Sequence, residues 1–471
     1  MTLPLLTPIK HQWIKSFTKK SDQIKELIER YHSPINVHHM APFEENYKEF
    51  SDVFNQYDLA HKIYFARKAN KSIAFVKEAK RLDFGVDTAS FKELSQCLEV
   101  GIPSENIALT AAVKEERLVR LAIENKVPIV IDNLDECALV QQVAEQLNKK
   151  VKVGIRIGGF LYEGKPLYSR FGFPPNEVVR MISENLGSRG KFNHLEFSGF
   201  HFHLNGYSPS QRAEAIIQTL TCVDELKSLN IPTQFIDIGG GFLINYLEDE
   251  NQWNHFHEQL RKAIKGEREE VTFRNDSLGY QLIDGNLYGD AKVYPYYNDK
   301  PRAKFLKEIL IYQDEYGTPV HSLLKNHNIE VRIEPGRSLL DQTGITCARV
   351  AFRKIDIAGN LLIGLEMNRT QMFSSSLDFL LDPIVLHQSS DSASEHVSGY
   401  LVGAYCLEQE LILKRKIAFK QKPQIGDIVC FVNTAGYMMH FYESEAHLFD
   451  LAKNLVAVSN LDEFIVKPDE E

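Results

Sequence analysis

The chain has 471 residues, with a hydrophobic content of 44% and a charged content of 25%, as in an ordinary globular protein. A chain of this length favours two domains. The net charge of −9 argues against a surface that binds the phosphate backbone of nucleic acids, since such a surface needs clustered lysine and arginine.

Membrane and disulfide signals are missing from the sequence. No run of about 18 apolar residues occurs, so no membrane-spanning helix is expected. The first residues lack the basic and apolar regions of a signal peptide. The six cysteines form no CxxC pair, which argues against a zinc site or a disulfide framework. We therefore expect a cytoplasmic protein with free thiols.

From residue 60 to 340, short β-branched or aromatic segments alternate with longer amphipathic ones. The amphipathic segments have apolar residues at three- and four-residue spacing, as in Ser72–Arg81, Phe91–Val100 and Lys114–Asn125. This alternation predicts parallel strands joined by helices. The expected strands are Ile63–Ala66, Phe84–Thr88, Ile107–Ala111, Pro128–Asp132, Val153–Ile157, Phe197–Leu204, Phe235–Gly239 and Val331–Glu334.

Two α/β folds would give this local pattern, a closed (β/α)8 barrel and a doubly wound open sheet. The number of expected strands favours the TIM barrel, as does the absence of a GxGxxG turn after the first strand. Residues 243–330 separate the last two expected strands, which is far more than a usual connection. Their aromatic run Tyr280–Tyr297 is too apolar for a disordered linker, so we expect an ordered insertion near the mouth of the barrel.

The sequence beyond about residue 341 is rich in short β segments with polar connections. This pattern predicts a second, mostly antiparallel β domain, which the early segment Ile35–His38 could join. The expected division is a barrel over 44–340, including the insertion, and a β-rich domain made of 1–43 and 341–471. The expected strands of the β-rich domain include Cys347–Phe352, Asn360–Leu365, Lys416–Phe419 and Asp427–Val432.

Residues that can carry chemistry lie where the expected barrel strands end, which is where barrel enzymes have their active sites. Each residue has a plain alternative. A lysine after a strand is usually a solvated surface residue, and a glycine triplet alone is usually a tight turn. His201 and His203 share one face of a strand and could bind a metal, but no third ligand of suitable spacing is evident. The full set is Lys68, Asp87, Arg156, His201, His203, Asp237, Gly239–Gly241, Glu334 and Arg337.

The position of the glycine triplet gives it more weight than its composition does. Phosphate sites of barrels are commonly built from the loops after strands seven and eight, and the triplet follows the seventh expected strand. Backbone N–H groups can approach an anion closely where no Cβ intervenes. The triplet is therefore a candidate phosphate site.

Seven segments, in order, make the chain similar to the fold-type III pyridoxal-phosphate (PLP) decarboxylases, which include diaminopimelate decarboxylase and eukaryotic ornithine decarboxylase. Together they extend from about residue 33 to 440. The resemblance implies a PLP-binding TIM barrel and decarboxylation of an amino acid. The matching segments are Tyr64–Asn70, Phe84–Ser90, Gly199–His203, Asp237–Phe242, Glu334–Leu339, Gly403–Cys406 and Ala435–Tyr437.

The resemblance also implies roles for individual residues. Lys68 would bond covalently to the cofactor aldehyde, and His203 would stack on the pyridine ring. The backbone N–H groups of Gly239–Gly241 would hold the phosphate, assisted by Tyr437 and the neighbourhood of Arg337. The remaining residues of the expected cofactor site are Asp87, Arg156, Glu334 and Gly336.

Glu334 distinguishes decarboxylation from a second reaction on the same fold. A carboxylate stabilises the protonated pyridine nitrogen, and a protonated ring accepts the electrons left when carbon dioxide departs. Alanine racemase, on the same fold, places an arginine at this nitrogen. Glu334 therefore favours decarboxylation over an amino-acid racemase or epimerase. A non-catalytic regulator like the antizyme inhibitors is the third alternative, disfavoured because Lys68, His203 and Tyr437 are all present.

Cys406 matches the family cysteine that enters the active site of the second subunit and helps to protonate the substrate carbon. The resemblance thus implies a homodimer with composite sites, in which Lys68, His203 and Cys406 are catalytic. A buried structural thiol is the alternative for Cys406.

Departures from the family pattern concern the substrate. The Glu-Ser-Gly-Asp segment that follows the cysteine in diaminopimelate decarboxylase is Leu407–Glu410 here, which makes Glu408 the candidate substrate-binding residue. No Arg-Pro pair follows Met367–Asn368, and Leu204–Gly206 replaces the glycine and serine after the histidine. We therefore expect a substrate other than diaminopimelate, with a polar or charged distal group, in siderophore or other secondary metabolism.

Overall fold

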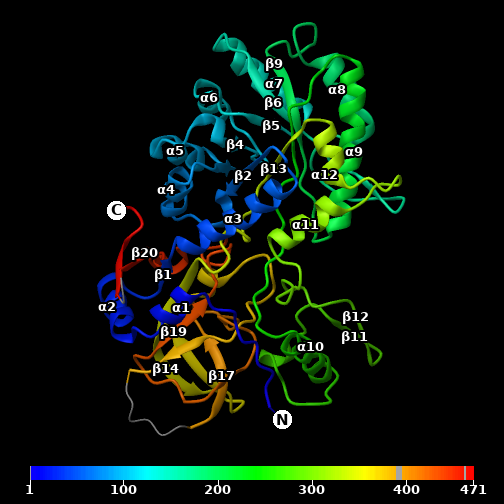
Figure 1. Ribbon diagram of the computed structural model, residues 1–471. Coiled ribbons are helices and arrows are strands. Elements are labelled where there is room, and N and C mark those ends of the chain that lie inside the picture. Colours follow the sequence, from blue (N-terminus) through cyan, green and yellow to red (C-terminus); the bar gives the residue numbers. More distant parts are fainter. Residues whose placement is uncertain (1, 389–394, 461–462) are drawn as a thin grey trace. The chain divides into compact units, whose positions relative to one another are not determined.

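The computed structural model describes residues 2–388, 395–460 and 463–471, and the chain folds into two compact units (Figure 1). One unit comprises Glu44–Leu243 and Lys300–Leu339. The other comprises the residues up to Phe43, Ile244–Asp299 and the residues from Leu340 onwards. No helix among the described residues is long and apolar enough to cross a membrane.

The first unit is a closed barrel of eight strands in the order β10-β13-β2-β3-β4-β5-β6-β9, and all neighbours are parallel. The closure confirms the barrel and excludes the open sheet. Every strand lies on a segment expected from its β-branched and aromatic residues. The strands are β2 (His61–Ala66), β3 (Gly85–Thr88), β4 (Ile107–Leu109), β5 (Ile129–Ile131), β6 (Val151–Arg156), β9 (Leu195–His201), β10 (Phe235–Asp237) and β13 (Glu330–Ile333).

Helices lie on the outside of these strands (Figure 1). Several begin at a side chain that accepts a hydrogen bond from the first turn, namely Ser72, Ser90, Asn133 and Ser208. Such caps satisfy N–H groups that have no partner within the helix, so they fix where each βα loop ends. The helices of this unit after α3 are α4 (Ile73–Arg81), α5 (Phe91–Val100), α6 (Glu116–Glu124), α7 (Leu134–Gln146), α8 (Pro175–Asn185), α9 (Pro209–Ser228), α11 (Ala303–Ile311) and α12 (Val320–Asn326); α3 (Ala41–Gln56) begins just before Glu44.

The second unit contains a nine-stranded, mostly antiparallel sheet, as the short β segments predict. β1 (Ile35–His38) belongs to this sheet, where it pairs with β14 (Gly344–Ile355) and with β20 (Lys453–Asn460). The helices α1 (Gln12–Phe17) and α2 (Ser21–Tyr31) precede it. The remaining strands are β15 (Leu361–Leu365), β16 (Ile384–Leu386), β17 (Val397–Val402), β18 (Ile417–Phe419), β19 (Ile428–Val432) and β21 (Glu463–Pro468).

The insertion divides between the two units, which differs from the expected assignment of 243–330 to the barrel. Residues 244–299 belong to the β-rich unit and contain α10 (Glu250–Ile264) and the hairpin β11–β12 (Gln281–Ile283, Asn286–Tyr288). The physical reason is aromatic packing: the buried rings of Tyr294 and Tyr296 lie against Tyr246 and Phe379 of the same unit. Residues 300–330 carry α11 and α12 of the barrel unit.

Candidate active site

Lys68 lies in a single turn of 3-10 helix, Arg67–Ala69, directly after β2. Its Nζ is 3.7 Å from Oδ2 of Asp87 on the adjacent strand β3, where Ala66 and Asp87 are register partners. The Lys68 side chain is 38% exposed, whereas the Asp87 side chain is 1% exposed. The amine is therefore held close to a buried acid while it stays accessible to a reactant.

Asp87 is an acid with an altered affinity for protons. Burial raises the pKa of Asp87 to about 6, and the nearby charge of Glu334 adds to this effect. Lys68 and a hydrogen bond from the Thr110 hydroxyl act in the opposite direction. Asp87 can therefore gain or lose a proton near neutral pH.

A row of polar side chains crosses three neighbouring strands beside this acid. Arg156 on β6 is the register partner of His201 on β9, and His201 is the register partner of Asp237 on β10. Glu334 follows β13, and its Oε1 is 3.2 Å from Nε2 of His201. All four residues are buried. The row therefore places four ionisable side chains in a buried environment.

The two carboxyl groups in this row compete for protons. Burial raises the pKa of Asp237 well above its usual value, and the charge of Glu334 raises it further. Burial also raises the pKa of Glu334, while Lys68, Arg156 and a hydrogen bond with Asp237 lower it. Burial therefore makes both carboxyl groups weaker acids than exposed ones, while Lys68 and Arg156 favour the ionised form of Glu334.

Neither histidine in this region is charged at neutral pH. Burial lowers the pKa of His201 well below its usual value, and the charge of Arg156 adds to this effect. Burial and the charge of Lys68 lower the pKa of His203 in the same way. The Nδ1 of His203 accepts a hydrogen bond from the backbone N–H of Gly240 at 3.2 Å, which requires an unprotonated Nδ1. His203 thus presents a neutral ring whose orientation is fixed by the glycine segment.

Side chains cannot be added to the glycine triplet without collision. A Cβ on Gly239 would lie 2.7 Å from the carbonyl oxygen of Phe202, and one on Gly240 would lie 2.4 Å from that of Glu334. Gly239 and Gly241 also have φ values of +68° and +83°, which side chains disfavour. Glycine is therefore required here by sterics as well as by conformation.

Arg212, on α9, binds the glycine triplet through hydrogen bonds to its carbonyl oxygens. Its side chain is among the largest fully buried ones, and its Nη2 donates to the carbonyl oxygens of Gly206 at 3.0 Å, Gly240 at 3.2 Å and Gly241 at 3.4 Å. In a trans peptide the C=O and the following N–H point in opposite directions. The N–H groups of Gly241 and Phe242 therefore point away from Arg212. Neither has a hydrogen-bond partner within the described parts of the chain.

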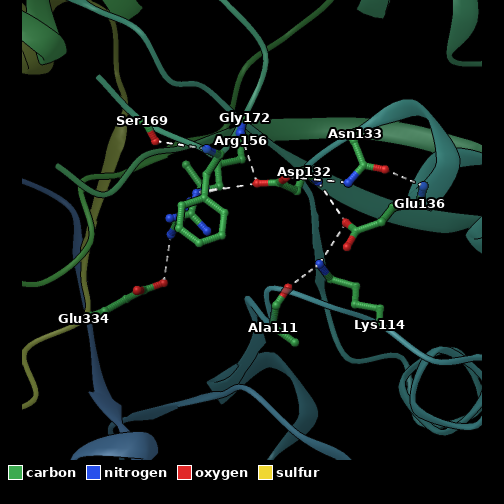
Figure 2. A network of polar contacts seen from close by, with 11 residues as sticks. Ala111, Lys114, Asp132, Asn133, Glu136, Arg156, Ser169, Gly172 and Glu334 are labelled. Atoms are coloured by element: carbon green, nitrogen blue, oxygen red, sulfur yellow. Dashed lines mark hydrogen bonds and ion pairs between the residues drawn. The ribbon is translucent and has the colours of Figure 1, made fainter. Parts of the chain in front are cut away.

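Arg156 connects the row to a second polar network (Figure 2). Its Nε is 3.9 Å from Asp132 at the end of β5, and its guanidinium lies 4.1 Å from the ring centroid of Phe171. Asp132 also accepts the backbone N–H of Gly172 at 3.0 Å. The network therefore fastens the loop after β6 to the barrel.

A buried lysine completes this network (Figure 2). Glu136 accepts the backbone N–H of Asp132 at 2.9 Å and pairs with Lys114 at the same distance. The Lys114 side chain is 1% exposed and also donates to the carbonyl of Ala111. The buried amine of Lys114 is thus bound within the protein, whereas the amine of Lys68 is accessible.

The other predicted site residues differ in how far they are buried. Gly336 is buried and Arg337 is half-buried in the barrel unit. Tyr437 is half-buried in the β-rich unit and has a φ of +72°. Cys406 is exposed, whereas the other five free cysteines are buried, so its thiol is accessible on the single chain. Glu408 is exposed as well, and its Oε2 is 3.8 Å from Nη2 of Arg274.

The residues of the barrel unit fit a pyridoxal phosphate. The N–H groups of Gly241 and Phe242, which have no hydrogen-bond partner among the described residues, suit a phosphate. Oε1 of Glu334 and Oδ2 of Asp87 are buried and form no hydrogen bond within the described residues, and their polar neighbours are Nε2 of His201 at 3.2 Å and Nζ of Lys68 at 3.7 Å. A buried carboxylate is stabilised by a nearby cation, and a protonated pyridine nitrogen is one. His201, Asp237 and Glu334 also lie close enough together to ligate a metal ion, the third-ligand geometry that the sequence alone does not reveal.

Sequence reasoning missed Arg212, Asp132 and Lys114. Asp132 ends an expected strand and could have been found by its position at the carboxyl end of the barrel. Arg212 has no such signal, because it lies within a helix and reaches the glycines through space.

Comparisons with known proteins agree with this geometry. A family model described as "Pyridoxal-dependent decarboxylase, pyridoxal binding domain" matches residues 40–275. An uncharacterized protein of Sinorhizobium fredii, y4yA, is 26% identical over 91% of this chain and 89% of its own length. The diaminopimelate decarboxylase of Bacillus subtilis is 27% identical over 56% of this chain and 63% of that enzyme.

Solved structures share the fold at low sequence identity. A diaminopimelate decarboxylase from M. jannaschii has a TM-score of 0.69 at 17% identity, covering 94% of this chain and 90% of that one. A lysine decarboxylase from Selenomonas ruminantium has a TM-score of 0.67 at 16% identity, covering 93% and 96%. The family model spans half of the chain, including Lys68 and the glycine triplet Gly239–Gly241. The chain therefore belongs to the pyridoxal-dependent decarboxylase family and is an amino-acid decarboxylase that uses PLP.

Proposed function

We propose that the protein decarboxylates an amino acid with a polar or charged distal group, with Lys68 as the residue that holds the cofactor. The observation that carries this proposal is the grouping of Lys68, Asp87 and Glu334, in which one accessible amine faces two buried acids. PLP, when bound, supplies an electron-accepting ring conjugated to the reacting carbon. The chain's own residues determine where the cofactor sits and which protons move.

Glu334 is the residue that we assign to the pyridine nitrogen. Its carboxyl is buried, and the positive charges of Lys68 and Arg156 lower its pKa and so favour its ionised form. A charged Glu334 keeps the ring nitrogen protonated. An acid at this position favours decarboxylation over racemisation, which agrees with family membership.

The glycine cradle and His203 orient the cofactor in this proposal. The expected phosphate contacts are the N–H groups of Gly239–Gly241, but those of Gly239 and Gly240 donate to Asp237 and His203 instead. The N–H groups of Gly241 and Phe242 would therefore donate to the phosphate, with assistance from Arg337 and Tyr437. The neutral ring of His203 would stack on the pyridine, and the hydrogen bond from the Gly240 N–H to its Nδ1 fixes the orientation of this ring. A neutral histidine adds no positive charge beside the ring, so it leaves the pairing with Glu334 undisturbed. Asp87, Arg156 and Gly336 complete the proposed cofactor site.

The substrate end of the proposed site comes from the β-rich unit of a second subunit. Cys406 and Glu408 are exposed on the single chain, as residues that enter a partner's site have to be. In a homodimer, Cys406 would deliver a proton to the substrate carbon and Glu408 would contact the substrate. We place this activity in the cytoplasm, where free thiols persist, and assign it to siderophore or other secondary metabolism by analogy.

A screen for carbon-dioxide release tests the proposal. The purified protein with PLP is supplied in turn with basic, acidic and citrate-conjugated amino acids. At least one should release carbon dioxide with the matching amine, and Lys68→Ala should abolish the release. Lys114→Ala is a poor control because that lysine is buried, so the exposed Lys77→Ala serves instead. Inversion of the substrate without carbon dioxide would replace the proposal with a racemase.

A further inference from the structure

The β-rich unit contains a cavity of about 570 Å³, and its lining residue Arg274 pairs with Glu408, the proposed substrate-binding residue. Its walls come from four separate parts of the chain: residues 273–276 of the insertion, 369–379 after β15, 409–414, and 438–442. Cavities that bind small molecules have about 300–1,000 Å³ and are mostly apolar with a few polar groups. This cavity has that size and that composition.

Apolar side chains that face solvent form one wall of the cavity. Phe373 and Tyr442 are 38% and 45% exposed, and their ring centroids lie 5.1 Å apart. The buried side chains of Met372 and Phe379 continue the apolar surface inward. Large aromatic rings left partly exposed around a cavity are a common mark of a binding site.

The acidic groups of the cavity already have partners within the protein. Asp276 pairs with Lys414 at 2.9 Å. Asp378 accepts the backbone N–H groups of Lys414 and Arg415 at 3.1–3.3 Å. Burial also raises the pKa of Asp378 to about 7, which reduces its negative charge at neutral pH. These acids therefore do little to repel an anion.

The two arginines of the cavity are held only loosely. Arg274 lies 3.8 Å from Glu408, and both side chains are mostly exposed, so this ion pair is weak. Arg369 lies 3.8 Å from Glu410 and donates to the carbonyl of Gln409 at 3.3 Å. A guanidinium has five N–H donors that suit a carboxylate in a two-point contact. Most donors of both arginines are not engaged by the described residues.

From this arrangement we infer that the cavity binds an organic carboxylate with an apolar body. The carboxylate is taken by Arg274 and Arg369, and the body packs against Phe373 and Tyr442. The ligand is either the distal part of a substrate or a separate effector, which share this chemistry. The inference goes beyond decarboxylation and does not require that Lys68 be the cofactor lysine.

The experiment measures binding to the PLP-loaded protein by calorimetry, with three matched probes. These are 4-phenylbutyrate, the neutral 4-phenylbutanol and the cationic 4-phenylbutylamine, in a buffer without carboxylates or phosphate. Phenylbutyrate should bind saturably at millimolar concentration and more tightly than either analogue. Arg274→Gln and Arg369→Gln should each weaken its binding by about tenfold, the loss of one charge-assisted hydrogen bond.

Two further variants sharpen the experiment. Phe373→Ala should weaken the binding of both phenylbutyrate and phenylbutanol, because it removes apolar contact. Arg30→Gln, at an exposed arginine on α2 of the same unit, should change nothing. Equal binding of the three probes, no saturable binding, or unchanged binding by both cavity arginine variants would overturn the inference.

Failure of the inference can be told apart from failure of the proposed decarboxylase site. Lys68→Ala should still bind phenylbutyrate, and loss of binding in that variant would place the probe in the barrel and overturn the cavity assignment. Binding that changes the visible band of the cofactor would identify the distal end of a substrate. Binding that leaves the band unchanged would identify an effector. Either result keeps the cavity as a carboxylate site.

Discussion

Replacing Arg212 by methionine should weaken the binding of PLP much more than it weakens the fold. The guanidinium donates to four carbonyl oxygens at 3.0–3.4 Å, those of Gly206, Ser208, Gly240 and Gly241, and forms no ion pair with an acid among the described residues. Its burial lowers its pKa to about 10, which shows that the charge is costly where it lies. Methionine removes that cost but leaves the carbonyls of the glycines without this donor, at roughly 1–3 kcal/mol each before they relax.

These opposing effects predict a small change in the free energy of unfolding and a larger change in the affinity for PLP. We expect a change in unfolding free energy of at most about 2 kcal/mol, since the desolvation of the charge is regained. In Arg212→Met, the carbonyls of Gly240 and Gly241 lose the hydrogen bonds that fix the directions of the following N–H groups. The N–H groups of Gly241 and Phe242 should therefore lose one or two hydrogen bonds to the phosphate. This loss predicts PLP binding weaker by about ten- to a hundredfold.

The assay is a titration of the apoprotein, followed through the visible band of the lysine-bound cofactor. Pyridoxal, which lacks the phosphate, is the matched ligand, and its affinity should be the same in wild type and Arg212→Met. Arg180→Met, at an exposed arginine on α8, is the matched control variant. Unchanged PLP affinity in Arg212→Met, or an equal loss for pyridoxal, would refute the role of Arg212 in orienting the cradle.

Three other predictions follow from the site. Glu334→Gln should keep PLP bound but release carbon dioxide at least about a hundredfold more slowly in single turnovers, since the ring nitrogen loses its ionic partner; wild-type turnover would contradict this. The pKa of Asp87 is raised to about 6, so between about pH 4 and 6 the folded apoprotein binds a proton that the unfolded chain has released. The unfolding free energy should therefore fall by at most about 3 kcal/mol as the pH rises from about 4 to about 6. Chemical denaturation at a series of pH values should show that Asp87→Asn lacks this contribution. Mixing Lys68→Ala with Cys406→Ala should restore about a quarter of wild-type activity if the sites are composite, because half of the dimers are mixed and each of these has one intact site; no recovery after proven subunit exchange would place Cys406 elsewhere.

The barrel could be predicted from the sequence because its local signals agree with its topology. Each strand is a short β-branched or aromatic run, and the helices between the strands show clear periodicity. The site residues at strand ends, such as Lys68 and Glu334, could be found by the same logic, since parallel strands in a barrel end on one rim.

Other features depend on contacts that a sequence pattern does not encode. Arg212 donates hydrogen bonds to glycines that lie far from it in the sequence, and no spacing in the sequence predicts this contact. The assignment of residues 244–299 to the β-rich unit depends on where Tyr294 and Tyr296 are buried. The cavity with Arg274 and Arg369 joins residues far apart in the chain, so it is visible only in the folded structure.

The identity of the cofactor lysine is the central claim, and reductive labelling tests it most directly. Borohydride fixes the cofactor to the lysine that holds it, and peptide mapping then locates the label. The predicted result is one labelled peptide that contains Lys68, and no label in Lys68→Ala. Label on Lys114 or on any other lysine in the wild-type protein would contradict the account.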